Sequence, residues 1–228
     1  MASDTQQDPV ATRQRLLDAA AEVFVEKGYR AATVRDICQR AGANIAGVNY
    51  YFRDKESLYR EMLLSPPAKS LEKHPRGAWR REGMSPEELL EGYVKDFLQR
   101  LFDPEKPAWH AILMAREMVD PTGAMDEMFE AFMRPQLQAL ERIIGAVVGR
   151  ELDARTMGHC IESVVPQIVF HILCQPVIRR LHPARRYDQA DIQEIARHIA
   201  RFSVAGIRAA AAVGAAGDVG GDVAAGGQ

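Results

Sequence analysis

The chain has 228 residues, of which 47% are hydrophobic and 26% charged, so it is long enough to bury a core in one large or two small domains. Its formal net charge of -2 excludes any case for nucleic-acid binding that rests on overall charge. A membrane span and a secretory signal are not expected, because no run of 18 apolar residues occurs and the N-terminus lacks an apolar core.

The first predicted helix begins near the N-terminus. Asp8 followed by Pro9 is typical of an N-cap and a first helical residue. Leu16, Leu17, Ala20 and Phe24 then recur at helical spacing, and Gly28 is a stop signal.

A second, short helix is predicted next. Thr33 and Asp36 have the spacing of a capping box, and the helix is expected to run through Arg40 and to end at Gly42. After a turn of about three residues, the pattern predicts a third helix over 45–52. Two helices joined by so short a turn, with a glycine in it, indicate a helix-turn-helix, whose second helix can enter a DNA major groove.

A fourth helix is expected after Asp54, which is placed to cap it, and its apolar positions are Leu58, Tyr59, Met62 and Leu63. Pro66-Pro67 and the polar stretch that follows indicate a domain boundary. The stretch 85–88, SPEE, restarts the helical pattern with a cap, a proline and a capping-box acid in order.

Helices are then predicted over 86–102, 107–118, 123–148, 154–181 and 189–211. Pro166 and Pro176 are expected to kink or split the fourth of these. The composition after 211 is low in complexity, so 212–228 is expected to be disordered. The fold class is therefore all-α, with a helix-turn-helix domain over 9–65 and a larger helical domain over 66–211.

The third helix has two different faces. Val48 and Phe52 are four residues apart and are expected to pack on the first helix, which leaves Ala46, Gly47, Asn49 and Tyr50 outside. Small residues allow close approach to base edges, and an Asn carboxamide can bond adenine bidentately. Residues 1–65 hold nine Lys/Arg and nine Asp/Glu, so DNA binding has to depend on where charges lie and on helix N-termini that favour phosphate.

The stretch RQRLLDAAAEVFVEKGYRAATVRDICQRAGANIAGVNYYFRDKESLY resembles the N-terminal domain of TetR-family transcriptional regulators over about 48 residues. The matching features are LLDAAAEVF, EKGY, TVRDI, AG before the recognition helix and YYFRDKESLY after it. The family most often has tyrosine at the position of Asn49, and this chain is similar to a subgroup with VNYHF there. The resemblance implies a homodimer that binds a palindromic double-stranded DNA operator, and a repressor released by a small effector.

By the same resemblance, the phosphate-contacting positions fall on Thr33, Tyr50, Tyr51 and Lys55. The base-contacting positions fall on Asn44, Ile45, Ala46, Gly47 and Asn49. Two of these have alternatives, because Ile45 also fits the buried stripe of its helix and Asn44 also fits an N-cap.

The larger domain is rich in Met and aromatic residues, which suit a pocket for a small apolar or aromatic effector but are equally typical of a helical core. Arg116 and Glu117 are adjacent and cannot share a helix face, so one of them is expected in solvent. The candidate effector-binding residues are Tyr93, Phe97, Phe102, Trp109, His110, Met114, Arg116, Met118, Met128, Phe129 and Met133.

The last two long helices are the candidate dimer surface, because each has an apolar stripe. The same stripes could instead cover the internal core, and both roles can hold together. The candidate interface residues are Val165, Ile168, Ile172, Ile195, Ile199 and Phe202.

No metal, cofactor or catalytic site is predicted. His159 with Glu162, and His171 with Cys174, have i, i+3 spacing, but the two pairs lie too far apart along one helix for a single site, so buried or capping histidines are expected. The odd number of cysteines, three, without framework spacing fits free thiols in a reducing cytoplasm. No phosphate-loop, zinc-protease or nucleophile-elbow motif indicates an enzyme. The alternative is a helical adaptor that does not bind DNA specifically.

Overall fold

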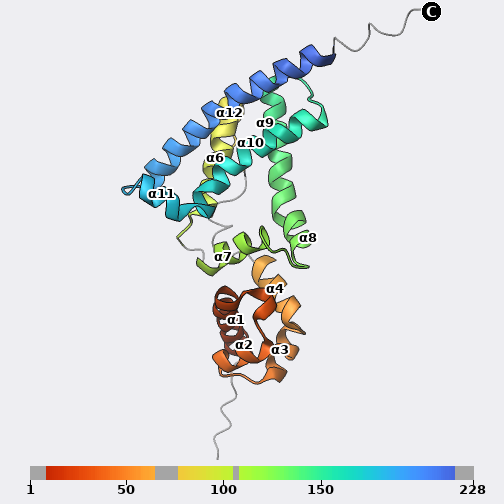
Figure 1. Cartoon of the computed structure of the whole chain (residues 1–228), viewed down its shortest axis with the longest axis vertical. Coiled ribbons are helices and arrows are strands. Elements are labelled where there is room, and N and C mark those ends of the chain that lie inside the picture. Colours follow the sequence, from red (N-terminus) through yellow and green to blue (C-terminus); the bar gives the residue numbers. More distant parts are fainter. Residues whose placement is uncertain (1–8, 65–76, 105–107, 219–228) are drawn as a thin grey trace, which may run out of the picture. The chain divides into compact units, whose positions relative to one another are not determined.

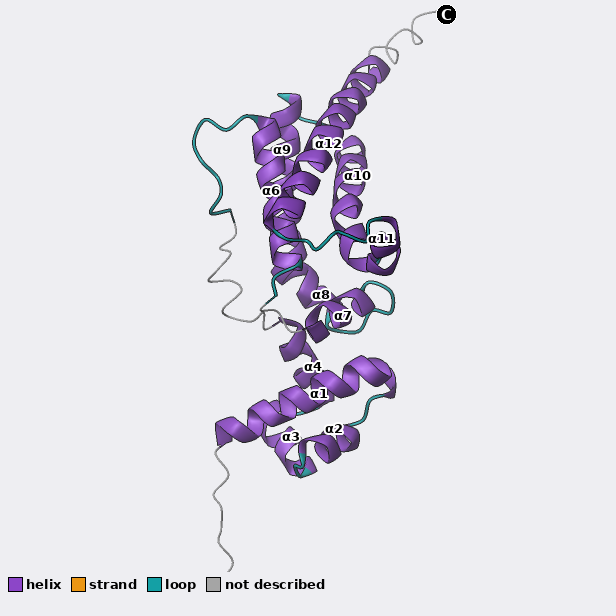
Figure 2. Ribbon diagram, turned by 90° about the vertical axis from the view of Figure 1, so that its left-hand side faces the viewer, coloured by secondary structure: helices purple, strands orange, loops and turns teal. Residues whose placement is uncertain are grey.

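A computed structural model of the chain describes residues 9–64, 77–104 and 108–218, and every regular element within these ranges is helical (Figures 1 and 2). The predicted all-α class is confirmed. The chain forms two compact units, and the division does not follow the chain order. Unit 1 contains Met1–Ser70 and Pro104–Met133, and unit 2 contains Leu71–Asp103 and Arg134–Gln228.

Unit 1 begins with the helix-turn-helix. Its core is formed by buried side chains such as Leu16, Phe24, Ile37 and Leu58, and Leu113 of the later segment joins them. The helices are α1 (Pro9–Ala31), α2 (Val34–Ala41), α3 (Ile45–Phe52), α4 (Lys55–Leu64), α7 (Ala108–Glu117), α8 (Met125–Met128) and the π-helix η1 (Phe129–Met133).

Local sequence sets the helix ends of unit 1. Gly28 has φ 76° and kinks α1, a backbone conformation that glycine adopts without steric cost. Thr33 and Asp36 form the predicted capping box, and Gly42, at φ 60°, ends α2 in the left-handed conformation. The predicted span of the third helix, 45–52, agrees with that of α3.

Unit 2 is a helical bundle in which α12 packs against α6, α9 and α10. The helices are α6 (Pro86–Leu101), α9 (Arg134–Val148), α10 (Ala154–Leu173), α11 (Gln175–Leu181) and α12 (Gln189–Asp218). Ser85 and Glu88 form the predicted capping box of α6. The Trp79 ring lies directly on Gly92 of this helix, where any Cβ would overlap it, so glycine is needed for that approach.

Two helical segments differ in part from the prediction. The helical segment 154–181 splits at Cys174, beside Pro176 as predicted, whereas Pro166 stays inside α10. Pro166 deprives the Glu162 carbonyl of its partner, and Glu162 is exposed, so water can replace the lost bond. The last helix runs to Asp218, seven residues beyond the predicted end at 211, because alanine has the highest helix propensity and 209–212 is an alanine run.

Part of the expected organisation falls outside the described residues. This is the case for the boundary at Pro66-Pro67 and for 219–228 of the predicted disordered tail. The prediction also grouped 104–133 with the second domain, whereas these residues cluster with unit 1. The reason is a set of polar contacts between α7 and the helix-turn-helix, described below.

Candidate nucleic-acid interface

Helix α3 is anchored by its N-cap and by two buried side chains. The Asn44 side-chain oxygen accepts a hydrogen bond of 3.1 Å from the Ala46 backbone N–H, so Asn44 caps the helix. Val48 and Phe52 are buried at 0% and 4% exposure in the core of unit 1. Because these two side chains fix the rotation of α3, the opposite face must point outward.

The outward face of α3 presents Ala46, Asn49 and Tyr50 to solvent, and Tyr50 is 80% exposed. Ile45, for which sequence left core and surface both open, is 48% exposed. Packing does not require the glycine at 47, since a Cβ there would meet only Leu16 Cδ1, at an ordinary 3.7 Å. The side chains at the centre of this face are thus small or polar, which suits a close approach to base edges.

The predicted phosphate-contacting residues have different surroundings. The exposed Thr33 hydroxyl donates to Asp36 Oδ2 at 2.8 Å, and the half-buried Tyr51 packs on the core of unit 1. Lys55 Nζ donates to the carbonyls of Tyr29 and Ala32, both at 2.9 Å, and lies 4.4 Å from the centre of the Tyr29 ring. An ammonium group has three donors, so one remains for an external anion.

Several acids around the helix-turn-helix are neutralised within the unit. Arg40 bonds both Glu22 and Glu26, which lowers the pKa of Glu26 through its hydrogen bond and charge. Lys27 lies 2.8 Å from Asp36, and the hydrogen bonds from Lys27 and Thr33 lower the pKa of Asp36 to about 2. The balanced charge count of this region therefore conceals acids that already have cationic partners.

Two arginines were missed by the sequence reasoning. Arg35, in the first turn of α2, and Arg53, which ends α3 at φ 72°, are both exposed, and neither forms an ion pair with a described residue. Cations near helix N-termini and next to a recognition helix suit phosphate. The sequence shows where both arginines lie, Arg35 just after Thr33 and Arg53 directly after Phe52. It does not show whether they form ion pairs.

Helix α7 is attached to the helix-turn-helix by its last turn. Arg116 donates from Nη1 to the Phe24 carbonyl at 2.5 Å and from Nη2 to the Val25 carbonyl at 2.7 Å. Glu117 is 1% exposed and accepts a 2.8 Å hydrogen bond from the Tyr59 hydroxyl. The expectation that one of the two adjacent charges is solvated is therefore wrong, because α1 and α4 meet different sides of α7.

The candidate effector residues are divided between the units. Tyr93, Phe97 and Phe102 belong to unit 2. Met128 is fully buried, Met118 is 42% exposed, and the Arg116 guanidinium is hydrogen-bonded to α1. The candidates in unit 1 are Trp109, His110, Met114, Arg116, Met118, Met128, Phe129 and Met133.

A polar stripe runs along α6 beside the predicted aromatic residues. The Tyr93 hydroxyl is buried and has no partner among the described residues, and burial raises the pKa of Tyr93 to about 12. Arg100 forms an ion pair with Asp96, one turn away, and donates to the Gln136 side chain of α9 at 3.2 Å. The i, i+4 spacing of Asp96 and Arg100 was the available sequence signal for this pair.

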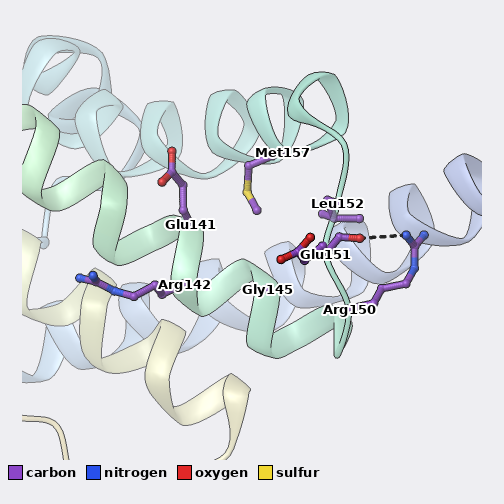
Figure 3. Close-up of a pocket in the computed structure, with 7 residues that line it drawn as sticks. All are labelled: Glu141, Arg142, Gly145, Arg150, Glu151, Leu152 and Met157. Atoms are coloured by element: carbon purple, nitrogen blue, oxygen red, sulfur yellow. Dashed lines mark hydrogen bonds between the residues drawn. The ribbon is translucent and has the colours of Figure 1, made fainter.

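A hollow of about 510 Å³ opens on unit 2 between α9, the turn that follows it and α10 (Figure 3). Glu141 and Met157 lie on opposite sides of it, and Arg150 donates a 3.1 Å hydrogen bond to the Glu151 carbonyl in the turn. None of the predicted effector residues lines this hollow. Its lining is Glu141, Arg142, Gly145, Arg150, Glu151, Leu152 and Met157.

The candidate dimer residues are mostly covered within one protomer. Ile168, Ile195 and Ile199 are at most 6% exposed and belong to the core of unit 2, and Val165 packs against that core. Ile172 is half-buried, and Phe202 is 67% exposed. Among the side chains that the structure describes, the large apolar ones left exposed on α10 and α12 are Phe170, Leu173 and Phe202.

No group of three or more metal-ligating side chains occurs among the residues that the structure describes. His171 Nδ1 lies 3.2 Å from the Tyr187 hydroxyl, and His159 is exposed. Within the described ranges, no single helix is long and apolar enough to cross a membrane. Among the same residues, α10 and α11 are long and apolar enough only when the two helices are taken together, and a bend of 82° separates them.

Comparisons with known proteins agree on one family. The model for bacterial regulatory proteins of the tetR family matches residues 16–62. The model for the C-terminal domain of the HTH-type transcriptional dual regulator CecR matches residues 86–207.

Individual proteins are similar at lower identity. The transcriptional repressor KstR2 of Mycolicibacterium smegmatis is 40% identical over 63 residues, which are 28% of this chain and only 31% of that protein. The transcriptional repressor AcnR of Corynebacterium efficiens is 25% identical over 178 residues, covering 78% of this chain and 84% of that protein. The crystal structure of the regulator FadR of Bacillus subtilis in complex with stearoyl-CoA shares the fold, with a TM-score of 0.54 and 18% identity over 85% of this chain and 98% of that one.

Proposed function

The chain belongs to the TetR family of bacterial transcriptional regulators, and on this premise we propose that it is a repressor that binds a palindromic operator as a homodimer and is released by a small effector. The names of the relatives KstR2 and AcnR, both repressors, support the direction of regulation. The repressor is proposed to act on operator DNA in the cytoplasm.

The observation that carries this proposal is the outward face of α3. A helix that served only as scaffold has no need for an exposed carboxamide and an exposed phenol beside a glycine that packing does not demand. Asn49 is proposed to bond a base edge in the major groove, with Ala46 and Gly47 allowing the approach. Ile45, half-exposed at the start of α3, is proposed to contact a thymine methyl group.

Phosphate contacts are proposed for side chains around that face. Tyr50 has an exposed hydroxyl, and Arg35 and Arg53 are exposed and form no ion pair with a described residue. Thr33, Tyr51 and the third donor of Lys55 complete the set. Such contacts hold the helix in register, and base contacts supply the sequence preference.

Dimerisation is proposed to use the outer faces of α10 and α12. Phe170, Leu173 and Phe202 are large apolar side chains left 46%, 47% and 67% exposed. Exposed apolar groups of this size on adjacent helices are typical of a protein–protein interface. Replacing Phe202 by Glu is expected to convert the dimer to a monomer in sedimentation velocity, and an unchanged dimer would place the interface elsewhere.

The effector is proposed to be a small apolar or aromatic compound bound in unit 2 beside Tyr93 and Phe97 of α6. The similar fold of FadR, which was solved with stearoyl-CoA, supports a ligand site in a bundle of this kind. The Tyr93 hydroxyl, buried without a partner, is available to a polar group of the ligand. Binding is proposed to shift the population toward a spacing of the two recognition helices that no longer matches the operator.

The test begins with selection of duplexes from a random library by the wild-type protein. Fluorescence anisotropy then compares wild type, Asn49→Ala and the control Gln138→Ala, which removes an exposed carboxamide on α9. Asn49→Ala is expected to lose about fivefold to 150-fold in preference for the selected duplex, since a bidentate base contact contributes about 1–3 kcal/mol. Gln138→Ala is expected to bind as wild type does.

The alternative, a helical adaptor, predicts a different result. An adaptor selects no duplex, and its residual DNA binding depends on salt alone. Preference retained in Asn49→Ala would keep the regulator but remove the proposed base contact.

A further inference from the structure

The last turn of α7 holds two helices of the DNA-binding unit through two neighbouring charged side chains. Arg116 bonds α1 and Glu117 bonds α4. Neither residue is part of the helix-turn-helix or of the outward face of α3. Their arrangement raises the question of whether they only stabilise unit 1 or also set the geometry of DNA recognition.

Arg116 is bound at the end of the straight part of α1. Its two guanidinium nitrogens reach the carbonyls of Phe24 and Val25, four and three residues before the kink at Gly28. Carbonyls near a helix C-terminus carry partial negative charge and favour a cation. Because the guanidinium donates to two successive carbonyls, it also fixes the orientation of α1 relative to α7, which a single hydrogen bond does not.

Glu117 is the centre of a buried cluster of hydrogen bonds. Its Oε1 accepts from the Tyr59 hydroxyl at 2.8 Å, and its Oε2 accepts from the Thr122 N–H at 2.9 Å and from the Thr122 hydroxyl at 3.2 Å. Tyr59 is itself 2% exposed and lies edge-on to Phe24, with the ring centres 4.9 Å apart. Tyr59 therefore connects α7, α4 and α1 at one point.

Burying a carboxylate is a costly way to stabilise a fold. Apolar residues of similar volume often give equal or greater stability, whereas a buried charge accepts only the arrangement that satisfies its hydrogen bonds. The segment that follows α7 carries an exposed ion pair, Asp120 with Arg30, which joins this segment to α1 without any burial. An ion pair at the surface is therefore enough to attach α1 to this segment, and the hydrogen bonds of Arg116 and Glu117 add a defined geometry.

The geometry of α1 and α4 passes directly to the recognition helix. α4 begins at Lys55, three residues after α3 ends at Phe52, and α1 packs against both α2 and α3. The side chains of Val48 and Phe52 rest in the core that α1 and α4 share. A change in the angle between α1 and α4 therefore changes the direction in which Asn49 points.

We propose that Arg116 and Glu117 are positioning residues for DNA recognition. This inference rests on the proposed operator binding. In this arrangement, loss of the hydrogen bonds of Arg116 and Glu117 releases α1 and α4 from α7. The released state keeps its cationic groups and its affinity for DNA in general, but it loses its preference for the operator.

The test measures selectivity, the ratio of affinities for the duplex selected by the wild-type protein and for an unrelated duplex. The variants are Arg116→Met and Glu117→Met, which keep side-chain volume, Glu117→Gln, which keeps an acceptor oxygen, and the control Asp120→Asn, which removes the charge from the exposed ion pair with Arg30. Each protein is measured at a temperature at which circular dichroism shows it to be folded.

Arg116→Met and Glu117→Met are expected to lose about tenfold or more in selectivity, because hydrogen bonds to charged groups contribute about 1.5–3 kcal/mol. Their affinity for the unrelated duplex is expected to stay within about twofold of wild type, because the phosphate contacts remain. Glu117→Gln is expected to recover part of the loss, and Asp120→Asn to match wild type. Hydrogen exchange is expected to rise in α3 and α4 of the Met variants only.

Folded Met variants with wild-type selectivity and exchange overturn the proposal, because the pair then serves stability alone. If either Met variant fails to fold, Tyr59→Phe decides, since it removes only the hydroxyl that bonds Glu117. A selectivity loss of about threefold or more supports the positioning role, and wild-type selectivity overturns it. If the wild-type protein selects no duplex, the proposed function fails and this inference falls with it. If the wild-type protein selects a duplex and the variants keep its selectivity, the proposed function stands and only this inference is overturned.

Discussion

The Tyr59 hydroxyl donates a 2.8 Å hydrogen bond to Glu117 Oε1 between two side chains that are 2% and 1% exposed. Burial and the neighbouring carboxylate raise the pKa of Tyr59 above its ordinary range, so the phenol stays a donor at any working pH. This bond joins α4 to α7, and with the Arg116 fork it explains why 104–133 groups with the helix-turn-helix.

A double-mutant cycle on this pair is expected to show strong coupling. Tyr59→Phe leaves Glu117 with one acceptor unused, and Glu117→Met removes both the charge and the acceptor oxygens. Measured by urea unfolding, the two changes are expected to interact by about 1.5–3 kcal/mol, as contacting residues in one buried network do. Effects that add to within about 0.5 kcal/mol would indicate that the bond is not formed in solution.

Gly47→Ala is expected to separate stability from DNA binding. The new Cβ meets only Leu16 Cδ1 at 3.7 Å, and alanine favours a helix by about 0.8–1.0 kcal/mol over glycine. The free energy of unfolding is therefore expected to rise, and affinity for the selected duplex to fall where α3 approaches the bases. Urea unfolding and fluorescence anisotropy on the same preparation test both parts. A variant that is more stable and binds the selected duplex as tightly as wild type would show that Gly47 is not part of the DNA interface.

Lys55 and Arg53 are expected to respond differently to truncation. Lys55→Ala removes hydrogen bonds to the carbonyls of Tyr29 and Ala32, so we expect a loss of about 1–3 kcal/mol in unfolding free energy. Arg53 is exposed and forms no ion pair with a described residue, so Arg53→Ala is expected to change stability by less than about 0.5 kcal/mol.

The salt dependence of DNA binding then tests whether both residues contact phosphate. The slope of log affinity against log salt is expected to fall by about one in Arg53→Ala, as for one lost phosphate contact. The same fall is expected in Lys55→Ala, measured under conditions in which it is folded, because the third donor of Lys55 is proposed to bind phosphate. A variant that keeps the wild-type slope would remove its residue from the proposed phosphate contacts.

Tyr93→Phe is expected to leave the free protein equally stable or slightly more stable. The hydroxyl is buried and has no partner among the described residues, and an unsatisfied buried polar group costs about 1–3 kcal/mol. Urea unfolding without effector checks this. A loss of more than about 1 kcal/mol would show that the hydroxyl is hydrogen-bonded in the free protein and is not held ready for a ligand.

Unit 2 is expected to lose stability as the pH falls from about 6.5 toward 4. Burial, with contributions from Arg185 and His182, lowers the pKa of His171 to about 4. Between the unfolded and folded pKa values the unfolded chain binds a proton that the folded chain does not, so the contribution is complete above about 6.5 and disappears toward 4. Because the side chain is half-buried and screened by water, we expect only about 1 kcal/mol.

The measurement compares urea unfolding of wild type and His171→Gln at pH 7.5 and pH 5. The wild type is expected to lose more stability than the variant on acidification. Equal losses would assign the pH dependence to other groups.

The helices and their ends were predictable because the signals that form them are local. Capping boxes at Thr33 and Ser85, the stop at Gly42 and the span 45–52 depend on residues within one or two turns, and the structure has each of them. The exposure of Asn49 and Tyr50 followed from the same local logic, since Val48 and Phe52 determine which side of α3 is buried. The alanine run after 208 was misjudged because low complexity concealed its helix propensity, and Pro166 was wrongly expected to interrupt its helix.

The sequence by itself thus determined an all-α chain with a helix-turn-helix and the family to which it belongs. The tertiary structure alone decided which charged groups are paired. Arg40 neutralises acids 14 and 18 residues away, and Glu117 meets a hydroxyl 58 residues away. The structure likewise decided that Ile168, Ile195 and Ile199 are covered within the protomer and that Phe202 is not. Helical periodicity identifies an apolar face, but what covers that face depends on contacts between distant segments, which no local pattern records.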